Sequence, residues 1–202
     1  MRYFYLLVLG AFICGTANSI GLAVRVGMLS LDTPSDDFIT ANCGTDAKFG
    51  TGIAFDIEVE QTWKSTGLGN LGTLNWNYSV EAGYWQAKAT GMDNSVTFKV
   101  IPTIAYGKLR IKIHKLPLSP YLRLGFDLPY FITSWESPVD GKKSINGFGF
   151  GLDAGIGLSY ILSSNIWVDL SITRMSCLIT SEEYEDLGAA GSKFAFAITI
   201  VE

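Results

Sequence analysis

The chain has little charge, a single histidine and no long uninterrupted hydrophobic run. Charged residues make up 17% of its 202 residues, and His114 is the one histidine. A zinc site or a Ser-His-Asp triad would therefore have to be built on that side chain. The net charge of −4 provides no basic surface for nucleic acid, and no stretch reaches the ~18 consecutive apolar residues of a membrane-spanning helix. We predict no metal or cofactor, no enzymatic activity and no nucleic-acid partner.

The chain is instead rich in apolar residues, glycine and aromatics. Hydrophobic residues make up 48% of it and aromatic residues 13%, and it contains 22 glycines. Glycine is a poor helix former, whereas aromatic residues are enriched in strands. The composition therefore favours a β protein, and the length is that of one domain.

The amino-terminal segment has the order of a secretory signal peptide. Arg2 precedes an apolar run over residues 3–14, and small residues follow over residues 15–19. This order predicts a signal peptide over residues 1–19 and a mature domain over residues 20–202. A lipoprotein signal that uses Cys14 is the alternative, although bulky Ile13 stands where a small residue is expected.

After residue 19 the apolar residues recur with a period of two. The clearest run places large apolar side chains from Phe148 to Tyr160 on one face, and glycine, Asp153 and Ser159 on the other. Seven further runs alternate in this way, over residues 21–28, 53–60, 74–84, 95–112, 121–128, 166–173 and 193–200. Strict alternation predicts strands, and Pro102 within its run predicts a bulge or an edge-like position.

The length and the two faces of these strands favour a membrane barrel. The runs last about 8–18 residues, whereas strands of soluble domains mostly last ~5–6 and a strand needs ~9–11 to cross a bilayer. Eight strands enclose too little room for the large apolar face, so that face points outward into lipid. We predict an all-β fold, an eight-stranded antiparallel up-and-down transmembrane β-barrel. The alternative is a secreted soluble β-barrel that carries a small apolar ligand.

The links between strands and the aromatic residues support this orientation. The odd-numbered links are the longer ones, at residues 32–48, 88–94, 134–145 and 178–190. This asymmetry predicts long extracellular loops, short periplasmic turns and both termini in the periplasm. Two groups of aromatics are candidates for interfacial girdles: Trp63, Trp76, Tyr121 and Trp167 near the short turns, and Tyr84, Trp85 and Tyr130 near the long loops.

The predicted inward face carries charges of both signs. In a narrow interior these groups must pair or stay hydrated, because an isolated buried charge is costly. Two alternatives stay open: an ion-paired plug that closes the lumen, and a narrow, cation-favouring water path. The predicted lumen-facing residues are Arg25, Lys99, Arg123, Lys193, Asp56, Glu58, Glu60, Glu81, Asp127, Asp153 and Asp169.

Two cysteines of the mature chain are candidates for a disulfide. Cys43 lies in the first long link and Cys177 at the start of the last one. Barrel closure brings these two links side by side, and an exported chain reaches an oxidising compartment. Two free thiols are the alternative.

Short glycine-rich segments resemble those of outer-membrane β-barrel families. They lie at residues 22–27, 101–105, 119–125, 151–160 and 165–169. The order of a Pro-Tyr segment, an Ala-Gly-x-Gly strand, a Ser-Asn turn and an Asp-bearing strand resembles OmpW-like eight-stranded proteins. The resemblance implies a monomeric barrel and the passage of small, often hydrophobic, molecules, although the charged inward face departs from the apolar lumen of that family.

The predicted function combines these observations. We expect an outer-membrane protein that acts as a passive narrow pore for small molecules, or as a surface-exposed anchor or adhesin. Its partners would be the outer-membrane lipid and a small solute or an extracellular ligand at the loops.

Overall fold

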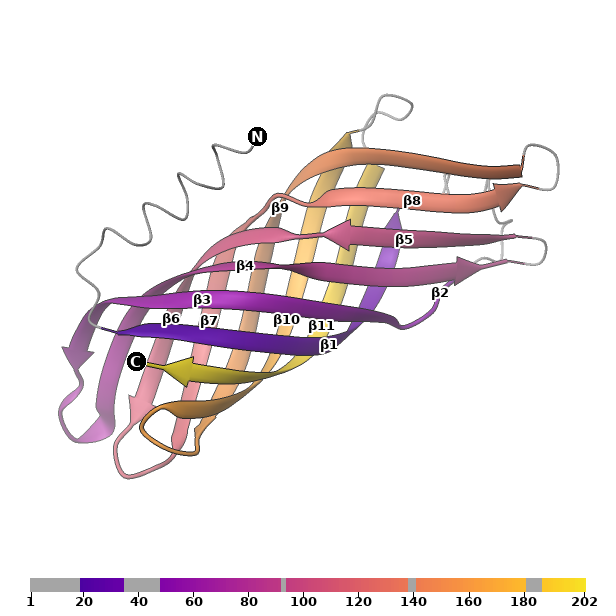
Figure 1. Cartoon of the computed structure of the whole chain (residues 1–202). Coiled ribbons are helices and arrows are strands. Elements are labelled where there is room, and N and C mark those ends of the chain that lie inside the picture. Colours follow the sequence, from indigo (N-terminus) through magenta and orange to yellow (C-terminus); the bar gives the residue numbers. More distant parts are fainter. Residues whose placement is uncertain (1–18, 35–47, 92–93, 138–140, 181–186) are drawn as a thin grey trace.

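The strands form one closed antiparallel sheet (Figure 1). The computed structural model describes residues 19–34, 48–91, 94–137, 141–180 and 187–202. No helix among these residues is long and apolar enough to cross a membrane. The elements are β1 (Ile20–Pro34), β2 (Lys48–Phe49), β3 (Gly52–Gly67), the 3-10 helix η1 (Gly69–Leu71), β4 (Gly72–Thr90), β5 (Ser95–Ile101), β6 (Thr103–Ile113), β7 (Leu118–Asp127), β8 (Tyr130–Ser137), β9 (Gly141–Ile161), β10 (Ile166–Thr180) and β11 (Leu187–Val201).

Together these strands make eight staves of a barrel. Strand β4 pairs with both β5 and β6, so β5 and β6 together form one interrupted stave. Strand β9 pairs with both β7 and β8, so β7 and β8 form another. Strand β11 pairs with β10 and with β1, which closes the sheet. The predicted eight-stranded antiparallel barrel is therefore confirmed. The interruption between β5 and β6 falls at Pro102, which has no N–H to donate to the ladder.

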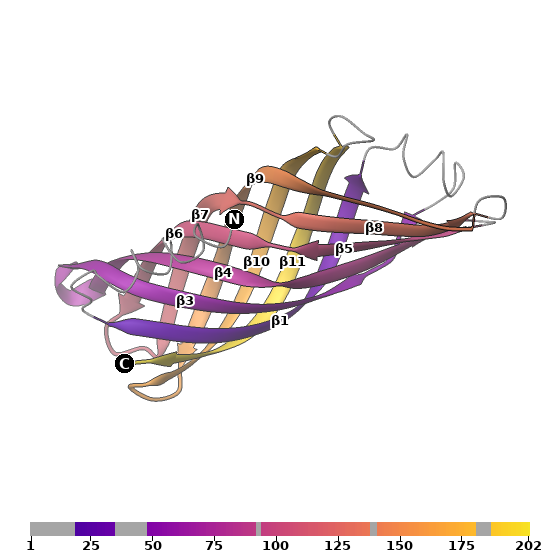
Figure 2. The same cartoon turned by 45° about the horizontal axis from the view of Figure 1, so that its top comes forward.

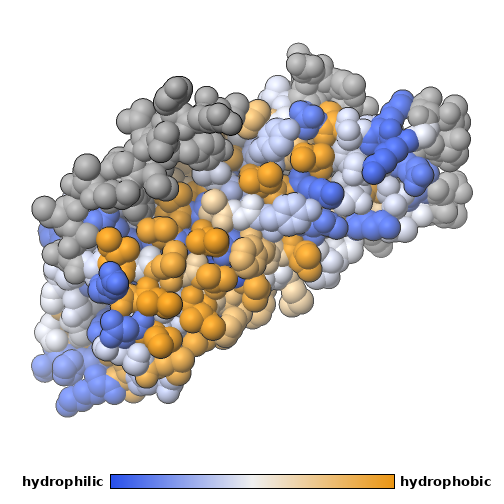
Figure 3. Space-filling model, in the orientation of Figure 1, coloured by the Kyte–Doolittle hydropathy of each residue, from blue (hydrophilic) through white to orange (hydrophobic). Residues whose placement is uncertain are grey.

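The outer surface carries a continuous apolar belt (Figure 3). Along β7, and along β9 from Ile145 onward, exposed and more buried positions alternate, and most of the exposed positions hold leucine, isoleucine or phenylalanine. Leu124, in the middle of β7, is 66% exposed. A soluble carrier would need these side chains inside, so this arrangement contradicts that alternative and matches a strand wall in contact with lipid.

The two ends of the barrel differ. The described chain begins and ends at one end, which also holds η1 and the short turns at residues 114–117 and 162–165; we call it the turn end. We call the opposite end the loop end, and the prediction that the turn end faces the periplasm and the loop end the exterior follows the usual pattern of outer-membrane barrels. At the loop end β4, β5, β8 and β9 project beyond the other strands (Figure 2).

This projection corrects the expected loop lengths. Residues 88–94 and 134–145 were predicted to be loops, but β4 extends to Thr90, β5 begins at Ser95, β8 extends to Ser137 and β9 begins at Gly141. Strand pairing continues there because Lys142 still lies opposite Glu136. The sequence of these stretches suggested loops because they lie outside the apolar belt and so carry few large apolar residues on their outward face.

The aromatic girdle prediction is correct in part. Trp63, Trp76 and Tyr84 are exposed on the outer surface. The prediction is wrong for three residues, because alternation along their strands turns them inward, where they are buried: Trp85, Tyr121 and Trp167.

Candidate functional site

The lumen is filled with charged side chains. Ten of the eleven predicted lumen residues are buried inside the barrel, and all except Glu60 are no more than 3% exposed. Each comes from the small and polar face of a strand whose other face forms the apolar belt. They lie on β1 (Arg25), β3 (Asp56, Glu58, Glu60), β4 (Glu81), β7 (Arg123, Asp127), β9 (Asp153), β10 (Asp169) and β11 (Lys193).

The prediction is wrong for Lys99. On β5 the buried positions are Val96, Phe98 and Val100, so Lys99 lies on the outward face. This part of the wall lies on the loop-end side of the apolar belt. Its outer face meets polar surroundings, so apolar side chains point inward and polar side chains point outward, the reverse of the arrangement in the belt.

Two lumen residues are absent from the predicted set. Lys108 and Arg110 face inward from β6 and are buried. Apolar residues occupy both faces of β6, with Ile104 buried and Ile111 exposed, which hides the alternation. Counting every second residue from Val100 through Pro102 would have placed both cations inside.

Glu81 is the centre of the ion-pair network. Its Oε2 accepts a hydrogen bond from Arg123 Nη1 at 2.8 Å, and its Oε1 accepts one from Lys193 Nζ at 2.5 Å. The Nε of Arg25 lies 3.5 Å from the same carboxylate. Three cations from three strands therefore converge on one carboxylate that is fully buried.

A second set of contacts extends toward the turn end. Glu58 pairs with Arg25, and its Oε1 accepts a hydrogen bond from Lys108 Nζ at 2.6 Å. Lys108 also pairs with Glu60, which lies 3.2 Å from Arg110 Nη2. Each cation in this set contacts two acidic side chains when the 3.7 Å separation of Arg110 and Asp169 is included. The lumen is therefore crossed by a continuous network rather than by isolated pairs.

The remaining hydrogen bonds involve Asp56 and Asp153, which lie on β3 and β9. Lys193 Nζ donates to Asp56 Oδ2 at 2.7 Å, and Trp85 Nε1 donates to Asp56 Oδ1 at 2.5 Å. Arg123 Nε donates to Asp153 Oδ1 at 2.7 Å. Each of these bonds joins two different strands, so the network cross-links the barrel through its centre.

Aromatic rings also contact ion-paired cations of the network. The guanidinium of Arg123 lies 4.3 Å from the ring centre of Tyr106, and Lys193 Nζ lies 4.6 Å from that of Trp85. Arg110 lies between Tyr121 and Trp167, at 4.9 and 4.7 Å. Cation–π contacts are strongest where water is excluded. These contacts explain why Trp85, Tyr121 and Trp167 point inward rather than into the girdles.

Asp127 differs from the other acids of the lumen. It is fully buried, and it forms no ion pair with any described residue. The described interior holds seven acidic and five basic side chains. Asp127, on the loop-end side of the network, is therefore an acid of this excess that has no paired cation among the described residues.

Apolar side chains close the lumen above the network. The cluster includes Trp85, Phe98 and Phe131, and the last two rings stack with centroids 6.1 Å apart. All its members are buried. At the turn end the lumen opens instead into a polar cup of about 290 Å³, lined by Glu60, Asn77, Arg110, Trp167 and other polar residues. The cup ends at the ion-pair network.

Glycines on the inward strand faces make room for these side chains. A Cβ added to Gly157 would lie 2.7 Å from the Cε1 atom of Tyr121, and one added to Gly151 would lie 2.7 Å from the Cα atom of Cys177. These contacts are shorter than van der Waals distances, so the alternating glycines of β9 are a packing requirement of the filled lumen.

Gly125 provides a test of this packing. A Cβ at Gly125 would meet the carbonyl oxygen of Ala105 and the Cβ of Tyr106, and would lie 2.6 Å from the Cα of Tyr106. We expect Gly125→Ala to lower the free energy of unfolding by about 1–3 kcal/mol, the usual cost of overpacking. Urea unfolding in lipid vesicles measures this change.

Gly107 is the matched control on the neighbouring strand. A Cβ there faces outward and meets only the carbonyl oxygen of Leu124, at 4.0 Å. We expect Gly107→Ala to change the free energy of unfolding by less than about 0.5 kcal/mol. Equal effects of the two alanines would contradict a tightly filled lumen.

The predicted disulfide and signal peptide involve residues outside the described part of the chain. Cys177 is buried on the inward face of β10, but Cys43 lies outside the described residues, so their disulfide stays a prediction. The signal peptide stays a prediction for the same reason. Within the described part of the chain, no group of three or more His, Cys, Asp and Glu side chains is arranged to hold a metal ion.

Comparisons with known proteins agree with this architecture. The family model described as outer membrane protein beta-barrel domain matches residues 4–197. The crystal structure of Neisserial surface protein A is similar over 92% of this chain and 98% of its own, with 12% identity and a TM-score of 0.50. The outer membrane protein OprG from Pseudomonas aeruginosa matches over 92% and 96%, with 11% identity and a TM-score of 0.51.

Other comparisons add no further information about function. The outer membrane enzyme PagL matches less well, with 11% identity, a TM-score of 0.43 and coverage of 88% of this chain and 97% of its own. No curated protein matches the sequence. The family match covers nearly the whole chain and the solved structures share its fold. The chain therefore belongs to the outer membrane protein beta-barrel domain family and is a bacterial outer-membrane protein.

Proposed function

We propose that the protein is a closed outer-membrane anchor that presents its extracellular end at the cell surface, as an adhesin or receptor does. The observation that supports this proposal most strongly is the packing of the lumen. Glu81, Arg123 and Asp153 at its centre are no more than 3% exposed, so they are almost completely withdrawn from water. The apolar cluster above them adds a second barrier to solutes.

The shape of the loop end also supports an anchoring role. Four strands project beyond the others (Figure 2), and their outer surface beside the belt is hydrophilic (Figure 3). Recognition residues are commonly carried by segments held on a rigid scaffold. Partners would be extracellular molecules that contact this end, together with the lipid around the belt, and the protein would act as a monomer.

We also propose that the barrel is not an enzyme. His114, the single histidine, is exposed in the turn between β6 and β7. The lumen acids are engaged by cations that hold them in place, except for Asp127, which is fully buried. A general base must reach its substrate within hydrogen-bond distance, and these buried carboxylates are not presented to any substrate.

Conductance across a planar lipid bilayer tests the closed-lumen proposal. We expect insertion of the folded protein to produce no steady conductance steps above the empty bilayer, because the network leaves no water path. A general porin inserted under the same conditions is the positive control, and heat-dependent gel mobility verifies that the protein has folded. Stable steps that scale with salt concentration would establish a pore and overturn the anchor proposal.

A further inference from the structure

The outer wall above the belt changes abruptly from aromatic to basic. Ile101, Tyr130 and Phe148 lie side by side on β5, β8 and β9, and the rings of Tyr130 and Phe148 are 4.9 Å apart. Tyr84 continues this row on β4. A band of exposed aromatics marks the boundary between hydrocarbon and headgroups. The next residues toward the loop end therefore lie at the level of the lipid headgroups.

Two lysines occupy this level on neighbouring strands. Lys99 on β5 lies opposite Gln86 on β4, and Lys88 on β4 lies opposite Thr97 on β5. Lys88 and Lys99 are therefore diagonal neighbours, and such residues are about 7–8 Å apart, within the reach of long side chains. We call Gln86, Lys88, Thr97 and Lys99 the lysine patch.

The patch offers hydrogen-bond donors, and among the described residues neither lysine has an acidic partner. The amide oxygen of Gln86 accepts a hydrogen bond of 2.8 Å from the hydroxyl of Tyr84, which leaves the amide nitrogen as the donor. Thr97 adds a hydroxyl group, and the positions directly across from it on β8 and β9 are Ser134 and Ser144. Within the described part of β8, Glu136 is the acid on this face, and it lies opposite another lysine, Lys142.

The opposite wall lacks such a patch. On β10 the first charged residue above the belt is Arg174, which pairs with Asp32 of β1 and donates to Ser192 at 3.1 Å. Among the described residues, the cation on that side is therefore paired with an acid, whereas Lys88 and Lys99 on the β4–β5 side are not. Figure 3 shows the hydrophilic surface of the projecting strands directly beside the belt.

We propose that the lysine patch binds a phosphate group of the outer-leaflet glycolipid. The patch continues the established lipid-facing surface, and it supplies two ammonium groups, an amide N–H and a hydroxyl to an anionic headgroup. Lysine side chains at this depth extend toward the headgroups while their methylene stems remain on the apolar wall. The bound lipid would fix the depth of the barrel at its β4–β5 side.

Binding of bisphosphorylated lipid A to the delipidated protein in detergent tests the proposal, with bound lipids counted by native mass spectrometry. We expect the double variant Lys88→Gln/Lys99→Gln to bind about thirty-fold more weakly, as removal of two lysines from an anionic membrane surface implies. Binding of the wild type should also weaken with added salt. The variant Lys88→Arg/Lys99→Arg keeps both charges and should bind like the wild type.

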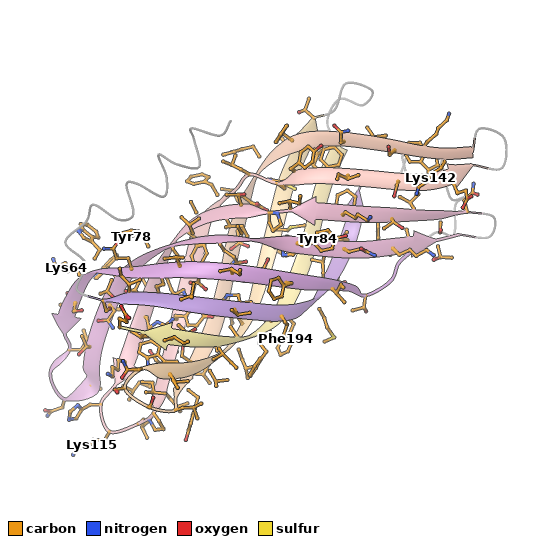
Figure 4. The ribbon with its side chains drawn as sticks, viewed as in Figure 1. Lys64, Tyr78, Tyr84, Lys115, Lys142 and Phe194 are labelled. Carbon is orange, nitrogen blue, oxygen red and sulfur yellow. The ribbon has the colours of Figure 1, made fainter. Side chains whose placement is uncertain are left out.

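The matched control removes two exposed lysines from the turn end. Lys64 and Lys115 lie at the end of the barrel opposite Lys142 (Figure 4). The variant Lys64→Gln/Lys115→Gln makes the same change in net charge and should bind lipid A like the wild type. The proposal is overturned if the Lys88→Gln/Lys99→Gln variant matches this control, or if the wild type binds dephosphorylated lipid A equally well.

Discussion

Replacing Glu81 with glutamine should destabilise the barrel more than any other single conservative change. The substitution keeps the shape of the side chain but removes the charge on which Arg25, Arg123 and Lys193 converge. These cations are buried, so they cannot recover the lost interaction from water. Breaking a buried ion pair by neutralising one partner typically costs about 3–5 kcal/mol. Urea unfolding in lipid vesicles should give a loss of about 3 kcal/mol or more.

The control for this prediction is an exposed glutamate on the same barrel. Glu136 of β8 is exposed and lies opposite Lys142. Surface ion pairs contribute about 0–1 kcal/mol, so Glu136→Gln should have little effect. If Glu81→Gln is as well tolerated as Glu136→Gln, the lumen is hydrated and the plug described above does not exist.

A positive charge in the middle of the belt should have the second largest effect. Leu124 lies at the centre of the outward face of β7, with Leu122 and Phe126 exposed on either side. Arginine near the bilayer midplane of a β-barrel costs about 2–4 kcal/mol, and the cost falls to about 0–1 kcal/mol near the interfaces. Leu124→Arg should therefore lower the free energy of unfolding in lipid by about 2–4 kcal/mol.

The same substitution at the turn end separates lipid exposure from other causes. Leu71 in η1 is 73% exposed, but it lies outside the belt. Leu71→Arg should change the free energy of unfolding by less than about 1 kcal/mol. Equal costs at positions 124 and 71 would mean that the apolar face is not in lipid.

The sequence predicted the strands and their faces best where the belt is complete. Along β9, large apolar residues from Phe148 to Tyr160 alternate with glycine, Asp153 and Ser159, and the structure exposes the first set. One face of this strand meets lipid and the other meets a polar lumen, so the residues on the two faces differ strongly in hydropathy. The glycines of β9, which as a motif carry no chemistry, turn out to be the space in which Tyr121 and Cys177 pack.

Prediction failed where the surroundings of the wall change along a strand. Above Pro102 the outer face of β5 meets polar surroundings, and Val96, Phe98 and Val100 turn inward, which places Lys99 outside. Below it the inward face of β6 carries Ile104 and Tyr106 first, and then Lys108 and Arg110. Chemical type alone therefore cannot assign a face, and strict counting of alternate residues along the strand is the better guide.

The network itself could not be derived from the sequence. The candidate residues were largely identifiable, but which cation meets which acid depends on the register of strands distant in the chain. Glu81 and Lys193 are 112 residues apart in sequence, and Arg25 and Glu58 are 33 apart. Their contacts follow from the pairing of β1 with both β3 and β11, which only barrel closure provides.

Fluorescence quenching of single-tryptophan variants in lipid vesicles tests most directly the central claim that the apolar face meets lipid and the lumen is closed. A variant that keeps only Trp76, exposed on the outer surface, should be quenched by brominated lipid. A variant that keeps only Trp85, buried beside Asp56 and Lys193, should be quenched neither by brominated lipid nor by aqueous acrylamide. Strong quenching of Trp85 by acrylamide would reveal an open, water-filled lumen, and quenching by brominated lipid would reverse the two faces of the wall; either result contradicts the closed barrel.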